Sequence, residues 1–336
     1  MLSFSFFIFL TSFLILSRYI KLYSAVNILF VFLVGCFFSL NRQNNDYDGY
    51  VEIFKDPASY AEPGYVLLVN IIKFFDGDHN TLIIFLGIFV FITFFRLIKY
   101  SNIIAFSLLC YMMFPMPIDI TQVRNTIALM FFINSLIDLS KSRLIISFLF
   151  VLISISFHFF GFVYFLIWIG LHFRYHPNFR FFILTSVLFS FALSPFLIPL
   201  LGSVSSLRTI SYYLSSSLKI HSLIIWGVSL FFDLLLIGYF QKKIRIKNES
   251  TMSFIIVIYS ALLLMLCFSS ALLFVDEFNR LFRTGYVLKY ILVASIIPFL
   301  SLKNSLILIF YVFFSALIMG LYFTLMLNYD FILFGL

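Results

Sequence analysis

The chain has 336 residues, of which 63% are hydrophobic and 11% charged, and its net charge is +8. A soluble globular domain carries roughly 25% charged residues, so 22 basic and 14 acidic side chains cannot cover a soluble protein of this length. The composition also excludes a disordered, fibrous or disulfide-stapled protein. It indicates an all-α, polytopic integral membrane protein with a single transmembrane domain over residues 1–336.

Apolar runs between the charged residues predict about 11–12 transmembrane helices, since a helix needs about 20 residues to cross a bilayer. The first run has no basic start of the kind that precedes a signal peptide, and we interpret it as a retained span. A shorter run at 64–75 contains Lys73 and is expected to be a re-entrant or interfacial helix. The predicted spans are 2–17, 22–40, 81–95, 102–118, 125–137, 143–157, 160–173, 181–200, 220–240, 252–275, 285–302 and 305–327.

The segment 143–173 lacks charge and could form one long tilted helix or two short ones. Basic residues concentrate in cytoplasmic loops, and this trend distinguishes the two alternatives. One uninterrupted helix would move the basic loop at 241–251 to the outside, so we favour a break near His158. The alternating scheme then places 13 of the 22 basic residues on the cytoplasmic side, and both termini outside. Those basic residues are Arg18, Lys21, Arg96, Lys99, Lys141, Arg143, Arg174, Arg180, Lys242, Lys243, Arg245, Lys247 and Lys303.

The first extracytoplasmic loop, 41–63, combines acidic and aromatic residues. Asp46, Asp48 and Glu62 could act as bases or bind a metal, while Tyr50 and Tyr65 could stack on sugar rings. A solvated loop, with Glu62 at a helix N-terminus, is the alternative. The three cysteines show no metal or disulfide spacing, and nothing in the sequence indicates an obligatory metal, a cofactor or a nucleic-acid partner.

Other polar groups are predicted at the outer ends of spans, where ionisable residues are most often functional. Arg124 follows Gln122 at the start of an apolar helix, and its guanidinium suits a phosphate or carboxylate. His158 stands at the break between two spans, where an imidazole can exchange protons. Arg280 and Arg283 share a helical face that suits a diphosphate, or they are neutralised by Asp276 and Glu277. For these residues the alternatives are a snorkelling side chain, as for Arg124, or a purely structural role, as for His158. Asp233 lies within a span and has no obvious partner in the sequence.

Four motifs in this order resemble the EpsG family of Wzy-type polysaccharide polymerases. They are Asp46-Tyr47-Asp48-Gly49-Tyr50, Glu62-Pro63-Gly64-Tyr65, Gln122-Val123-Arg124-Asn125-Thr126-Ile127-Ala128 and Phe157-His158-Phe159-Phe160-Gly161. The resemblance implies a GT-C-like glycosyltransferase of the bacterial inner membrane. Such an enzyme joins undecaprenyl-diphosphate-linked repeat units, which serve as donor and acceptor, into O-antigen or another surface glycan at the periplasmic or exterior face.

The same resemblance implies roles for the polar groups. His158, or else Asp46 or Glu62, would be the base, while Arg124, Arg280 and Arg283 would stabilise the departing diphosphate. Besides the bilayer, a chain-length regulator and a flippase are candidate partners. Another polyprenyl-linked glycosyltransferase stays open as an alternative, as does a lipid-linked oligosaccharide flippase or transporter. The last is disfavoured because the two halves of the chain differ.

Overall fold

The computed structural model describes residues 23–42, 44, 46–59, 61–101, 103–204, 219–244 and 248–327. The predicted first span at 2–17 and part of the basic loop at 241–251 lie outside these residues. Everything described is helix or connecting loop, without strands. The longer helices are α2 (Tyr23–Leu40), α3 (Tyr47–Lys55), α4 (Pro63–Phe74), α5 (His79–Phe95), α6 (Ile104–Met113), α8 (Val123–Ser140), α9 (Leu144–Phe157), α10 (Phe160–Gly170), α11 (Phe179–Val204), α14 (Ser229–Gln241), α15 (Glu249–Met265), α16 (Asn279–Ile296) and α17 (Leu302–Leu327).

Short helical segments join or extend these helices. α13 and the π-helical η4 lead into α14, η5 extends α15, and η6 precedes α16. Their bounds, with those of the remaining short segments, are η1 (Pro57–Ser59), η2 (Ile98–Tyr100), α7 (Met116–Asp119), η3 (Leu171–Phe173), α13 (Ile220–Ser222), η4 (Leu223–Val228), η5 (Leu266–Leu273), η6 (Asp276–Phe278) and η7 (Ile297–Phe299).

Five continuous helical stretches of the described chain are long and apolar enough to cross a membrane. They are His79–Tyr100, Ile220–Gln241, Glu249–Leu273, Asn279–Phe299 and Leu302–Phe323. Six shorter apolar helices accompany them, among them α2, α6, α9 and α11. The prediction of an all-α, polytopic membrane protein is therefore confirmed.

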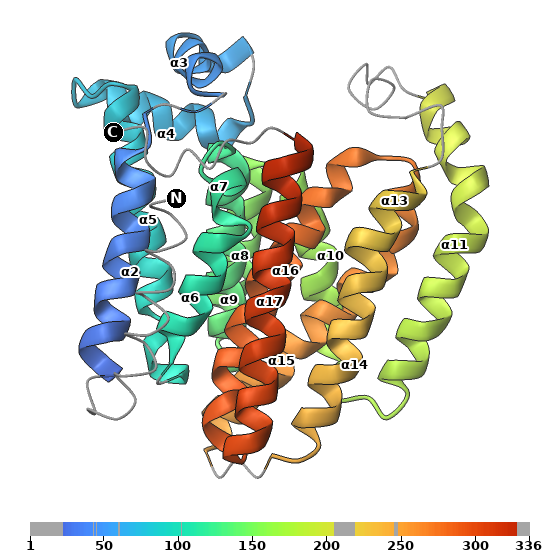
Figure 1. Cartoon of the computed structure of the whole chain (residues 1–336). Coiled ribbons are helices and arrows are strands. Elements are labelled where there is room, and N and C mark those ends of the chain that lie inside the picture. Colours follow the sequence, from blue (N-terminus) through green and yellow to red (C-terminus); the bar gives the residue numbers. More distant parts are fainter. Residues whose placement is uncertain are drawn as a thin grey trace.

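Three helices form the centre of the bundle, and the others surround them (Figure 1). Every residue of α6 is buried, as is nearly every residue of α8 and α16. By contrast, α5, α9, α11, α14 and α17 expose rows of large apolar side chains, which suit a lipid environment. α3 and α4 lie together at one end of the bundle, the upper end in Figure 1.

The predicted break at His158 is confirmed. α9 ends at Phe157, His158 is extended (φ −160°, ψ 145°), and α10 begins at Phe160. Gly161 permits the sharp reversal, because a Cβ there would lie 2.4 Å from the backbone of Ser154. No side chain fits at that distance, so the glycine allows α10 to pack against the end of α9.

A second glycine brings α4 against the same place. A Cβ on Gly64 would lie 2.3 Å from the Ser156 hydroxyl and 2.8 Å from the Ser156 carbonyl oxygen. Pro63, at the first position of α4, suits a helix start because its missing N–H would have no partner there. The helix therefore begins at Pro63 and places the preceding residue, Glu62, beside the α9–α10 break.

The most buried charges of the described chain form an ion pair inside the bundle. Lys289 Nζ on α16 lies 2.8 Å from Asp233 Oδ2 on α14, and the two side chains are 0% and 1% exposed. The Tyr311 hydroxyl on α17 donates to Asp233 Oδ1 at 2.7 Å, and Lys289 donates to the Ser315 hydroxyl at 3.1 Å. Asp233, which has no obvious partner in the sequence, therefore connects three helices.

Candidate active site

The first turns of α8 and α16 lie at the same end of the bundle as α4 and the α9–α10 break. α8 begins with Val123-Arg124, and α16 begins with Asn279-Arg280 and carries Arg283 one turn later. The apolar run predicted a start for α16 at 285, whereas the helix begins at Asn279. The early turns need not be apolar, because their polar side chains have partners in the site.

Arg124 connects the start of α8 to the residue before α4, Glu62. Its Nη1 lies 2.6 Å from Glu62 Oε2, and both side chains are about a quarter exposed (23% and 27%). Glu62 is the residue before α4, but its carboxylate makes no capping hydrogen bond there. Tyr50 on α3 also faces Arg124: burial raises the pKa of Tyr50, and the nearby guanidinium opposes that rise.

His158 lies between two spans with little exposure (7%). Arg280 Nη1 approaches its Nε2 at 3.0 Å, and the Phe160 backbone N–H donates to its Nδ1 at 3.1 Å. Burial, followed by the charges of Arg280, Arg124 and Arg283, lowers the pKa of His158 to about 3. The imidazole is therefore neutral at neutral pH, in contact with Arg280 and within the electrostatic influence of Arg124 and Arg283.

Arg280 and Arg283 have different partners. Arg280 Nε lies 2.5 Å from Glu277 Oε2, so one of the two predicted acidic partners does pair with it. Arg283 is buried, and its Nη2 donates to the side-chain oxygen of Gln122. The charge of Arg283 also acts on the buried carboxylate of Asp119, which accepts a hydrogen bond from the Tyr111 hydroxyl at 3.2 Å.

Asp46 and Asp48 are placed differently from the other candidates. Both are exposed at the start of α3 and form no ion pair with a described residue. Tyr65 is completely buried on α4, with its ring centroid 6.4 Å from that of Tyr50. Within the described ranges, no three His, Cys, Asp or Glu side chains gather as ligands for a metal ion.

Several residues that complete the site were not predicted. The sequence indicates Glu277 only as an acid that could neutralise the arginines, and it assigns no role to Asp119. The hydroxyls of Tyr164 and Thr284 lie 2.8 Å apart and join α10 to α16. Tyr164 also stacks on Phe132 of α8, with ring centroids 4.4 Å apart. These contacts connect residues far apart in the sequence, and no local spacing indicates them.

The arrangement suits an anion bordered by polar groups. The N-terminal ends of α8 and α16 add their partial positive charge to that of the arginines. In addition, the Tyr65 hydroxyl and the Asn125 side-chain oxygen are buried without a hydrogen-bond partner in the described structure. Buried polar atoms without partners are unfavourable, and a ligand hydroxyl could reach these two only if neighbouring side chains moved, since neither atom is exposed.

Comparison with known proteins gave one match. Residues 21–334 match the model of the EpsG family, which covers nearly the whole chain. No curated protein matches the chain, and no solved structure matches it.

Proposed function

The chain belongs to the EpsG family, a family of Wzy-like polysaccharide polymerases, and on that premise we propose that it is a glycosyltransferase for lipid-linked repeat units. The donor is a glycan on undecaprenyl diphosphate, and the acceptor is a second unit of the same kind. The observation that carries this proposal is the contact of Arg280 with the neutral imidazole of His158, on which the charges of Arg124 and Arg283 also act.

In the proposed reaction, the anomeric carbon of the donor exchanges one oxygen for another. Its bond to the diphosphate oxygen breaks, and a bond to the acceptor hydroxyl oxygen forms. The bonding electrons leave with the diphosphate, whose charge increases in the transition state. Guanidinium groups already in place stabilise such developing charge without reorganising, and this role falls to Arg124, Arg280 and Arg283.

The proton of the acceptor hydroxyl needs a base, and His158 is the best-placed candidate. It is neutral, so the ring nitrogen that Arg280 contacts can accept a proton once Arg280 turns to the diphosphate, whereas Glu62 is held in an ion pair with Arg124. Asp46 is exposed on α3. An anion next to Arg280 would offset the positive charge that disfavours protonated His158, so the bound diphosphate itself makes the imidazole a stronger base.

Sugar binding is proposed for the groups around this centre. Tyr50 presents a partly exposed aromatic ring that packs against buried Tyr65, and Gln122 presents an amide next to the arginines. Asp46 and Asp48 would contact parts of the glycan that reach α3. The site lies at the end of the bundle opposite the predicted cytoplasmic loops, so we place it at the periplasmic or exterior face of the inner membrane.

The test compares surface glycan from cells that lack the gene and carry wild type, His158→Ala or Arg124→Ala. Deletion should leave glycan with a single repeat unit, and wild type should restore the ladder. Both variants should insert normally but give only the single-repeat form. A normal ladder from both variants would refute the site. Loss of all surface glycan on deletion would instead indicate a flippase or a single-sugar transferase.

A further inference from the structure

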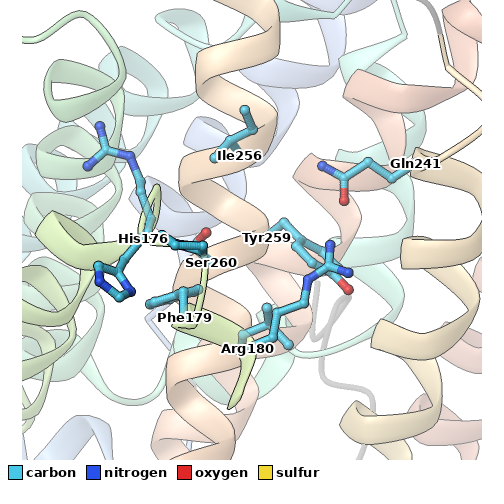
Figure 2. A pocket seen from close by; sticks show the side chains of 10 residues that line it. His176, Phe179, Arg180, Gln241, Ile256, Tyr259 and Ser260 are labelled. Carbon is cyan, nitrogen blue, oxygen red and sulfur yellow. The ribbon is translucent and has the colours of Figure 1, made fainter. Parts of the chain in front are cut away.

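A polar cavity lies at the other end of the bundle, away from the candidate active site. Its volume is about 310 Å³, within the range of small-ligand sites. Figure 2 shows His176 just before α11, Phe179 and Arg180 at its start, Gln241 at the end of α14, and Ile256, Tyr259 and Ser260 on α15. The end of α14 lies opposite α3 and α4 in Figure 1, as does the connection between α10 and α11.

The cavity is rich in positive charge. Arg174 and Arg180 both line it, and neither forms a salt bridge with a described carboxylate. The Nε of Arg174 is buried without a hydrogen-bond partner in the described structure, although its Nη1 donates to the Leu171 carbonyl at 2.7 Å. The Arg180 charge reaches the Tyr259 hydroxyl across the cavity. The positive end of the α11 dipole adds to this potential.

Apolar side chains form another part of the wall, among them Phe179, Ile256 and Leu263. On α15 the lining extends from Ile256 to Leu263, about two helical turns. Just beyond Arg180, Phe181 and Phe182 are exposed on α11, and Leu235 and Tyr239 are exposed on α14. A ligand with an anionic head and an acyl chain would therefore find basic side chains for the head and apolar side chains for the chain.

We propose that this cavity binds the phosphate of an anionic phospholipid from the leaflet opposite the active site. Arg174 and Arg180 would contact the phosphate, while Gln241, His176 and Ser260 would offer hydrogen bonds to the rest of the headgroup. Basic pockets between transmembrane helices on the cytoplasmic side are suited to such headgroups. This cavity is separate from the proposed catalytic centre, so the proposal does not depend on the polymerase reaction.

The test uses the full-length chain in nanodiscs of phosphatidylcholine with or without phosphatidylglycerol. After release into detergent, native mass spectrometry counts the phosphatidylglycerol that each chain retains. The variant is Arg174→Gln/Arg180→Gln. The matched control is Lys242→Gln/Lys303→Gln, which removes two exposed basic side chains that do not line the cavity.

Wild type and control should retain phosphatidylglycerol, and the double arginine variant should bind it at least tenfold more weakly, on the order expected for two basic contacts to an anionic lipid. Equal retention by all three proteins would overturn the proposal. A thermal shift from millimolar inorganic phosphate equal to that from phosphatidylglycerol would also overturn it, because the ligand would then be a soluble phosphate. The single variant Arg180→Gln changes an exposed side chain and gives the answer if the double variant does not fold.

Discussion

Replacing Lys289 by Met should destabilise the protein by about 3–5 kcal/mol, because the carboxylate of Asp233 would stay buried without its cation. The magnitude follows from the burial of the pair, because the two side chains are 0% and 1% exposed and water cannot take the place of the missing cation. The hydrogen bond from Tyr311 remains and cannot replace a full positive charge.

The assay is thermal unfolding of the purified protein in detergent, followed by the loss of the monodisperse peak in size-exclusion chromatography. Lys289→Met should unfold well below wild type at pH 7. The double variant Asp233→Asn/Lys289→Met removes both charges and should recover most of the loss.

The control is Arg143→Gln, whose side chain is 58% exposed and lies 3.8 Å from Asp138. An exposed ion pair contributes about 0–1 kcal/mol, so this variant should unfold close to wild type. The reasoning is refuted if Lys289→Met unfolds like Arg143→Gln. It is also refuted if the double variant is no more stable than Lys289→Met.

Three further predictions concern the candidate active site. Arg124→Lys keeps the charge but loses the planar guanidinium, so the rate of polymerisation of lipid-linked units in vitro should fall about 10²–10³-fold. Glu62→Gln keeps an oxygen that Arg124 can contact, so its rate should fall less. Gly161→Ala should lower the unfolding temperature because its Cβ would lie 2.4 Å from backbone, whereas Gly49→Ala, with open space around it, should not; equal unfolding temperatures would contradict the packing argument. The unfolded chain protonates His158 below about pH 6.5 but the folded chain does so only near 3, so stability should decrease as pH falls through this window; His158→Asn should flatten that slope in unfolding temperatures measured against pH.

Much of the fold follows from local patterns. Long apolar runs predict the membrane helices, and the positive-inside trend predicts the break at His158, which the structure confirms. The predicted span began at residue 285 because an apolar run ends at the nearest charged residue. The helix α16 begins earlier, since its first polar side chains have partners. α3 was also not predicted, since Phe54 is its only buried residue and the rest of its sequence resembles a solvated loop.

The site was predictable in composition but not in pairing. The sequence could select four of the residues, because ionisable side chains at the outer ends of spans are most often functional. They are Arg124, His158, Arg280 and Arg283. The contacts of Arg280 with His158 and of Lys289 with Asp233 depend on how distant helices pack. Single residues in separate spans carry no signal for such pairs beyond their opposite or complementary chemistry.

The hydrogen bonds of His158 couple its ring to the position of Arg280. A neutral imidazole has one lone pair that can accept a hydrogen bond, yet two donors approach the ring, the Phe160 amide and Arg280. One of the two donors therefore faces a ring N–H instead of a lone pair. An oxygen-rich anion that draws Arg280 away would remove this conflict, so anion binding and the choice of tautomer at His158 are linked.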